Sequence, residues 1–186
     1  MPDPTDQTSD HILIASFKDE KLREISFTHL VKKYQERLYW HIRRMVIEHE
    51  DTNDILQNVF IKVWKNLGEF REESYLYTWL YRIGTNEALT WIDQKKRRSS
   101  VSMSDSEDIF ADRLVAQKDF DPSKIEWKLQ QAIQTLPEKQ RIVFNLRYYD
   151  EMPYEEMAEV LTTSVGALKA SYHHAVKKVE AFLKGN

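Results

Sequence analysis

Apolar side chains recur every three or four positions through most of this chain, which is the spacing of one face of an α-helix. Between residues 21 and 48 the recurring positions are Phe27, Leu30, Val31, Tyr34, Leu38 and Ile42. Between residues 50 and 67 they are Ile55, Val59, Val63 and Leu67. The pattern therefore predicts two long amphipathic helices whose apolar faces lie in the core of the protein.

The same spacing predicts the rest of the architecture. Further helices are expected over residues 9–18, 75–98, 124–135, 137–149, 154–161 and 165–183. A short helix, a three-residue turn at 162–164 and a longer basic helix are typical of a helix-turn-helix. The predicted fold is therefore all-α, with two small helical domains at 9–98 and 124–186, the second of which contains this helix-turn-helix.

Two segments lack the helical spacing. Residues 99–123 are rich in Ser and Asp and carry six acidic against two basic side chains. We interpret them as a flexible acidic linker between the domains. Residues 1–8 contain Pro, Asp and Thr without periodicity, which predicts a disordered N-terminus. The first residues also lack the basic and apolar regions of a signal peptide.

Composition narrows the class of protein. The chain has 186 residues, 4 Gly, 5 Pro and no Cys, which favours helices and excludes disulfides and thiolate metal sites. Its net charge is −3, but residues 74–98 carry five basic against two acidic side chains and residues 165–186 carry four against one. Five aromatic residues lie between positions 75 and 91. Aromatic rings beside basic groups suit binding to single-stranded nucleic acid, because every base can stack on a ring.

Four sequence motifs carry a family resemblance. Residues 54–60 read DILQNVF with Trp64 following, and residues 78–83 read TWLYRI with NEA at 86–88. Residues 136–141 read LPEKQR, and YEEMA at 154–158 is followed by SVGALK at 164–169. In this order and spacing, over about residues 9–183, the motifs resemble bacterial RNA polymerase sigma factors of the extracytoplasmic-function (ECF) class.

The resemblance implies a transcription initiation factor that is not an enzyme and needs no cofactor, metal or small-molecule substrate. Such a factor binds the clamp coiled coil and the flap of core RNA polymerase, and it recognises and melts promoter DNA. It implies region 2 of the family in the first domain and region 4 in the second. It also implies an anti-sigma factor as a partner and a cytoplasmic location, with no membrane insertion, although an anti-sigma factor could hold the chain at the inner membrane.

The resemblance assigns candidate residues to each partner. Polymerase binding falls to Asp54, Gln57, Asn58, Ile61, Lys62 and Trp64. Contact with the minus-ten element falls to Phe70, Arg71, Glu72, Ser74, Tyr75, Arg82, Asn86, Lys95, Arg97 and Arg98. Contact with the minus-thirty-five element falls to Ser164, Lys169, Ser171, Tyr172, His173, Lys177 and Lys178.

The chain departs from the family pattern at two places. Asn58 stands where an acidic residue is usual, which weakens the expected polar contact with polymerase. After Lys169 the chain reads ASYHH, which is less basic than the usual recognition helix. The promoter preference of other members therefore does not transfer to this chain.

Plainer interpretations stay open for several features. The polar face of residues 50–66 could be the solvated face of any bundle helix, and Trp79 and Trp91 are better explained as core residues. Adjacent His173 and His174 point about 100° apart on a helix, which is poor geometry for a shared metal. The main rival function is a helix-turn-helix regulator that binds DNA without polymerase, and a weaker rival is an enzyme that uses His41 or His49.

Overall fold

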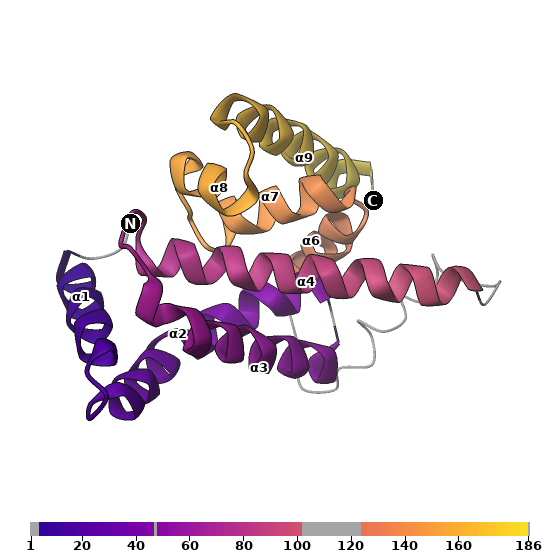
Figure 1. Cartoon of the computed structure of the whole chain (residues 1–186). Coiled ribbons are helices and arrows are strands. Elements are labelled where there is room, and N and C mark those ends of the chain that lie inside the picture. Colours follow the sequence, from indigo (N-terminus) through magenta and orange to yellow (C-terminus); the bar gives the residue numbers. More distant parts are fainter. Residues whose placement is uncertain (1–3, 47, 102–123, 186) are drawn as a thin grey trace.

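The computed structural model describes residues 4–46, 48–101 and 124–185, in which the chain forms helices and connecting turns and no strand. The elements are α1 (Pro4–Lys18), α2 (Arg23–Val46), α3 (His49–Asn66), the short 3₁₀ helix η1 (Leu67–Glu69), α4 (Leu76–Val101), α6 (Lys124–Gln134), α7 (Glu138–Tyr148), α8 (Tyr154–Leu161) and α9 (Val165–Gly185). The predicted all-α fold is confirmed (Figure 1). None of the helices described is both long and apolar enough to cross a membrane.

The first domain is a bundle of α2, α3 and α4, with α1 packed across one end (Figure 1). Its interior is lined by the positions that the sequence pattern singled out. These include Leu30, Leu38, Ile42, Val59 and Val63, none of which exposes any measurable surface. The intervening polar positions face solvent, so the amphipathic pattern alone accounts for how these helices are oriented.

The N-terminal helix begins earlier than the sequence indicated. α1 starts at Pro4 rather than at residue 9. Proline suits the first turn of a helix because its fixed φ is helical and its missing N–H would have no intrahelical acceptor there. Further along, Asp10 is buried and accepts hydrogen bonds from the Tyr34 hydroxyl (2.6 Å) and the Lys33 ammonium (2.7 Å).

The helix that follows the 3₁₀ turn is longer than predicted. α4 extends to Val101, three residues into the segment that we interpret as a linker. At 1.5 Å per residue its 26 residues span about 39 Å. The rest of the predicted linker, 102–123, lies outside the described residues.

The second domain contains the predicted helix-turn-helix. α8 ends at Leu161, and Thr162, which follows it, adopts a left-handed conformation (φ 49°) that terminates the helix. The Ser164 hydroxyl then accepts a hydrogen bond from the backbone N–H of Ala167 (3.3 Å), which caps the start of α9. Buried Met157 and Leu168 join the two helices, so the turn holds α9 in a fixed orientation on α8.

The two domains are in contact with one another. α8 packs against α4, and α7 packs against α2 (Figure 1). A single cluster of buried apolar residues includes Leu38 and Leu80 from the first domain together with Leu146, Met152 and Met157 from the second. The second domain also has a smaller core of its own, formed by α6, α7 and α9.

Candidate polymerase and nucleic-acid interfaces

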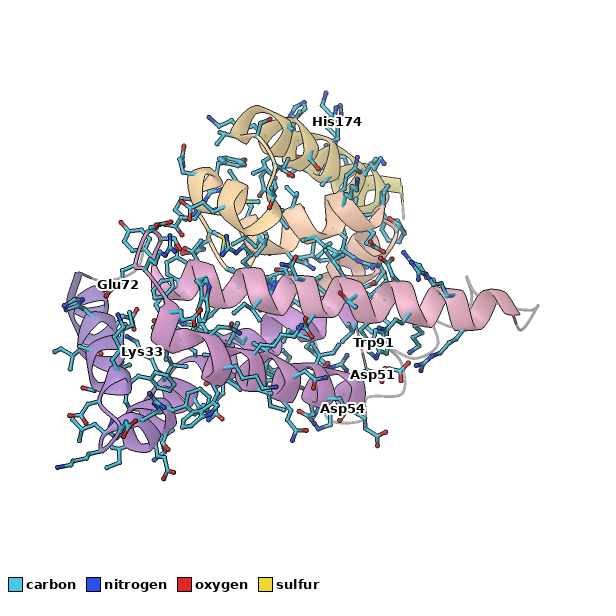
Figure 2. All side chains as sticks on the ribbon, viewed as in Figure 1. Lys33, Asp51, Asp54, Glu72, Trp91 and His174 are labelled. Atoms are coloured by element: carbon cyan, nitrogen blue, oxygen red, sulfur yellow. The ribbon has the colours of Figure 1, made fainter. Side chains whose placement is uncertain are left out.

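One face of α3 presents all six predicted polymerase-binding residues to solvent. Ile55, Val59 and Val63 are buried on the opposite side of the helix, so the register of the core fixes which residues point outward. Asp54, Gln57, Asn58, Ile61, Lys62 and Trp64 are all at least partly exposed. Figure 2 shows Asp54 at the outer edge of α3. The sequence therefore placed these residues together on one helix face.

Two of the six also contribute to the structure of the first domain. The Lys62 ammonium forms an ion pair with Glu87 of α4. The Trp64 ring is 38% exposed and packs edge-on against Phe17 (5.3 Å between centroids) and Phe27 (5.0 Å). Substitution of Trp64 would therefore disturb the packing of α1 and α2 as well as the exposed face.

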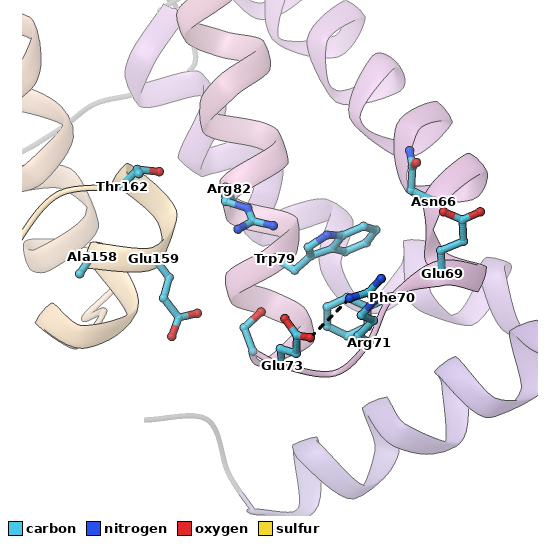
Figure 3. A pocket seen from close by; sticks show the side chains of 11 residues that line it. Asn66, Glu69, Phe70, Arg71, Glu73, Trp79, Arg82, Ala158, Glu159 and Thr162 are labelled. Atoms are coloured by element: carbon cyan, nitrogen blue, oxygen red, sulfur yellow. Dashed lines mark ion pairs between the residues drawn. The ribbon is translucent and has the colours of Figure 1, made fainter.

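A pocket of about 560 Å³ opens where the loop before α4 meets α8 (Figure 3). From the first domain it is lined by Asn66, Glu69, Phe70, Arg71, Glu73, Ser74, Trp79 and Arg82. The Phe70 and Trp79 rings lie 5.0 Å apart and tilted by 38°, which forms an aromatic wall. Phe70 is only 8% exposed, and Trp79 is half-buried. The lining combines this aromatic surface with both signs of charge, because Glu69, Glu73 and Glu159 lie there with Arg71 and Arg82, and Arg71 is paired with Glu73 at 4.0 Å.

Four predicted minus-ten residues, Phe70, Arg71, Ser74 and Arg82, line this pocket, and others lie beside it. Glu72 has a left-handed backbone (φ 58°) and its carboxylate lies 2.7 Å from the His11 ring of α1. Tyr75 is exposed and stacks against Tyr77 at 6.1 Å. Asn86 is exposed one turn beyond Arg82.

The remaining predicted minus-ten residues lie at the far end of α4. Lys95 is 13 positions after Arg82, which corresponds to about 20 Å along the helix. Its ammonium pairs with Glu48 (2.8 Å) and Asp51 (3.3 Å) and lies over the Trp91 ring at 4.4 Å. Burial raises the pKa of Asp51 above its usual value, against the opposing effect of Lys95. Arg97 and Arg98 follow Lys95 and are exposed.

The predicted minus-thirty-five residues divide into an outer and an inner group on α9 and its turn. Ser164, Lys169, His173 and Lys177 are at least partly exposed, as is Lys178, whereas Ser171 and Tyr172 are half-buried. The Tyr172 ring stacks on Phe144 (5.8 Å) and contacts Tyr154 (6.4 Å), so it packs within the second domain. Figure 2 shows His174 on the outer surface of α9, on the side of the molecule opposite to Asp54.

Comparison with known proteins shows the family to which the chain belongs. Residues 30–98 match the family model for sigma-70 region 2, and residues 126–179 match the model for sigma-70 region 4. The RNA polymerase sigma-H factor of Pseudomonas aeruginosa is 34% identical over 169 residues, which cover 86% of each chain. The ECF RNA polymerase sigma-E factor of Escherichia coli K12 is 29% identical over 185 residues, which cover 95% of each chain. The chain belongs to the ECF class of RNA polymerase sigma factors.

A solved structure agrees with the fold of this sigma factor. The sigma factor RpoE from Bartonella quintana, in complex with the anti-sigma factor NepR, superposes with a TM-score of 0.69. The alignment covers 85% of this chain and 96% of that one at 19% identity. At this identity the likeness supports the fold alone.

A polar cluster between the two domains was not among the predicted site residues. Asp150, in the turn between α7 and α8, lies against the first domain. Its Oδ1 accepts a hydrogen bond from the Tyr81 hydroxyl (3.2 Å) and lies 3.2 Å from Nη1 of Arg44, and its Oδ2 lies 3.4 Å from Nδ1 of His41. Arg44 and Asp150 are 106 positions apart, so no local pattern in the sequence could have indicated this cluster.

Two groups of this cluster, His41 and Tyr81, belong to the first domain. His41 is buried and its other ring nitrogen lies 2.8 Å from the Thr85 hydroxyl. Burial, followed by the neighbouring Asp150 carboxylate, raises the pKa of Tyr81. The phenol therefore stays protonated and donates its hydrogen bond to Asp150.

The rival interpretation of His41 and His49 as catalytic groups gains nothing from their surroundings. His49 contacts Tyr39 and Asn53 at the surface, and His41 lies in the cluster just described. In the part of the chain that the structure describes, no three His, Asp or Glu residues are grouped as a metal site would require.

Proposed function

We propose that this sigma factor initiates transcription by binding core RNA polymerase through the exposed face of α3 and directing it to promoters. The observation that carries this assignment is the separation of three surfaces on one small chain: the α3 face, the pocket before α4 and the outer face of α9. A regulator that only binds an operator has no use for the first two, so the helix-turn-helix regulator is the weaker alternative.

The pocket suits a base that has left the DNA stack. Removing a base from a duplex costs a few kcal/mol, and stacking on an aromatic ring returns about 1–3 kcal/mol. Phe70 and Trp79 supply the aromatic wall, and Arg82 supplies positive charge for an adjoining phosphate, while Arg71 shares its charge with Glu73. We assign the pocket to the non-template strand of the minus-ten element and the exposed side chains of α9 to the major groove of the minus-thirty-five element.

The relatives support a further partner. The sigma factor RpoE of Bartonella quintana was solved as a complex with an anti-sigma factor, and we extend that class of partner to this chain. We place the protein in the cytoplasm, where its polymerase works. On this assignment it catalyses no reaction of its own.

The experiment is co-purification with core RNA polymerase. The variant carries Asp54→Ala, Gln57→Ala and Ile61→Ala, three exposed positions of the α3 face that avoid the packed Trp64. The matched control carries Lys32→Ala, Gln35→Ala and Glu36→Ala on the exposed face of α2. We expect the wild type and the control to bind polymerase and the α3 variant to lose binding at least tenfold while retaining wild-type helicity.

Failure of the wild type to bind polymerase, together with tight binding to duplex DNA alone, would replace this proposal with the stand-alone regulator. Equal binding by the α3 variant and the wild type would move the docking surface away from α3.

A further inference from the structure

The loop before α4 turns one of its side chains away from the pocket. Arg71, Glu73 and Ser74 line the pocket, whereas Glu72 between them is not among the described residues of the lining. Glu72 also has a left-handed backbone (φ 58°), which a residue other than glycine adopts only where its surroundings hold it. Figure 2 shows Glu72 at the end of the molecule where α1 lies. The conformation of this loop therefore depends on what contacts Glu72.

The partner of Glu72 lies on α1. Nδ1 of His11 is 2.7 Å from Oε2 of Glu72, although the two residues are 61 positions apart. An ionised carboxylate only accepts hydrogen bonds, so the His11 ring donates through Nδ1. The two side chains are 70% and 35% exposed. The pair is a long-range contact at the surface, and it can hold the loop only if α1 is itself held firmly.

The residue before His11 fixes the orientation of α1. Asp10 is buried, and its carboxylate accepts hydrogen bonds from the Tyr34 hydroxyl (2.6 Å) and the Lys33 ammonium (2.7 Å) of α2. Burial of a carboxylate without such partners is costly, so α1 cannot rotate about its axis without losing free energy. The direction in which His11 leaves the helix is therefore set by its neighbour Asp10.

Further contacts attach α1 to the rest of the first domain. The Ser26 hydroxyl of α2 donates a hydrogen bond to the backbone carbonyl of Leu13 (2.7 Å). The Phe17 ring is buried and lies edge-on to Trp64 of α3 at 5.3 Å. α1 also packs against η1, the 3₁₀ helix that leads into the loop. These attachments to α2, α3 and η1 make α1 a fixed support beside the loop.

The family match does not account for this role of α1. Residues 30–98 match sigma-70 region 2, and α1 ends before them. An exposed ion pair contributes little to the stability of a whole protein, because solvent screens it. Surface loops open at a low cost in free energy, however. A weak contact with a fixed helix can therefore decide which conformation such a loop adopts.

We propose that α1 positions the minus-ten pocket: the hydrogen bond from His11 holds Glu72 on the α1 side of the loop, which directs Arg71, Glu73 and Ser74 toward the pocket. His11 is a positioning residue, because it acts through Glu72. Glu72 is then an anchor of the loop and not a contact with DNA, which differs from the role that the sequence motifs imply for it. The inference rests on the proposed function, since it concerns the same pocket.

The first measurement is amide hydrogen exchange over residues 70–76 of the free chain, followed by mass spectrometry. His11→Ala removes the donor, and it should leave α1 folded because Ala favours a helix more than His does. His11→Asn keeps a side-chain N–H donor at about the position of Nδ1. The control His29→Ala removes an exposed imidazole from α2.

We expect His11→Ala to raise the exchange rate of the loop about threefold, as suits the loss of one exposed pair. His11→Asn and His29→Ala should exchange at the wild-type rate. Unchanged exchange of the loop in His11→Ala would overturn the inference. Exchange that rises equally throughout α1 would also overturn it, because the effect would then belong to the helix and not to the contact with Glu72.

The second measurement is run-off transcription from fragmented genomic DNA of the host, by core polymerase assembled with each chain. It compares His11→Ala, Glu72→Ala and the double variant. If Glu72 acts only as the anchor, each single change and the double change should lower transcription by the same factor, about threefold, because they remove one shared contact. His11→Asn should keep the wild-type level.

Two results of the transcription assay would contradict different parts of the argument. A larger loss with Glu72→Ala than with His11→Ala, and a double loss equal to the product of the two, would make Glu72 a direct contact with DNA and overturn the inference. No transcription with the wild type, or faster loop exchange without any change in transcription, would instead refute the function proposed for the pocket. The exchange rates of the free chain would then decide by themselves whether His11 holds the loop.

Discussion

The interior of the first domain and its contact with the second domain are built differently. The interior joins α2, α3 and α4 through fully buried Leu, Ile and Val side chains at helical spacing. The contact adds to its apolar residues a buried carboxylate, a guanidinium, an imidazole and a phenol. An apolar interior is costly to open, because every exposed methylene group loses transfer free energy. The contact also buries Met152 and Met157 in the same apolar cluster as the interior, so it differs from the interior by its polar groups, which can exchange their partners for water.

A change in the interior of the first domain should lower the free energy of unfolding most. Leu38 lies at the middle of α2 and exposes no surface. We expect Leu38→Ala to lower the free energy of unfolding by about 3 kcal/mol, because the change removes buried methyl groups and leaves a cavity. Urea denaturation followed by circular dichroism measures the effect.

Leu22→Ala is the matched control for this change, because Leu22 is 45% exposed. We expect it to cost less than about 0.5 kcal/mol. Equal losses for Leu22→Ala and Leu38→Ala would show that the interior is not the main source of stability.

A variant in the pocket should lower transcription and leave the free energy of unfolding unchanged. Arg82 is exposed on α4 and lines the pocket. We expect Arg82→Gln to leave unfolding unchanged and to lower run-off transcription by the polymerase complex about fivefold, from promoters in fragmented genomic DNA of the host. The loss of one phosphate contact should also reduce the slope of log activity against log salt by about one.

Lys32→Gln is the control for Arg82→Gln, because it removes one positive charge from the exposed face of α2. Unchanged transcription with Arg82→Gln, or an equal loss with Lys32→Gln, would show that the pocket does not take part in promoter binding.

The sequence predicted the interior far better than the contact between the domains. α8 was predicted with its observed ends, Tyr154 and Leu161, because Pro153 and the polar turn mark both of them. The exposed face of α3 followed from the four-residue spacing of its core positions. Both predictions use information that lies within one helix.

The contact between the domains could not be predicted in this way. In the sequence, Asp150 has the features of an ordinary turn residue. Its partner Arg44 lies 106 positions earlier, on a helix with many other charged side chains. Tyr81 belonged to an aromatic group that suits nucleic acid, yet it is only 4% exposed and donates its hydrogen bond to Asp150. Helical spacing reports which face of a helix is buried but not which distant side chain covers it.

The smallest expected change is in the pH dependence of stability, and it arises at Glu156 in α8. Burial, and then the neighbouring carboxylate of Glu159, raise the pKa of Glu156. Among the described residues its Oε2 is buried and has no hydrogen-bond partner. A raised pKa means that the folded chain holds this proton more tightly than the unfolded chain. Ionisation of Glu156 therefore lowers stability as the pH rises from the unfolded value, about 4.5, through the raised folded value.

Glu156→Gln removes this cost, so we expect a higher melting temperature than the wild type at pH 7 and an equal one below about pH 4, where both side chains are neutral. The gain should be at most about 0.5 kcal/mol, because solvent screens a carboxylate that is only partly buried. Glu155→Gln, one residue earlier on the exposed side of α8, controls for the removal of a negative charge from the helix. Thermal unfolding of the three chains across this pH range measures the difference. A gain that is the same at every pH would mean that the amide improves the packing of α8, since relief from burying a charge must disappear once Glu156 is protonated.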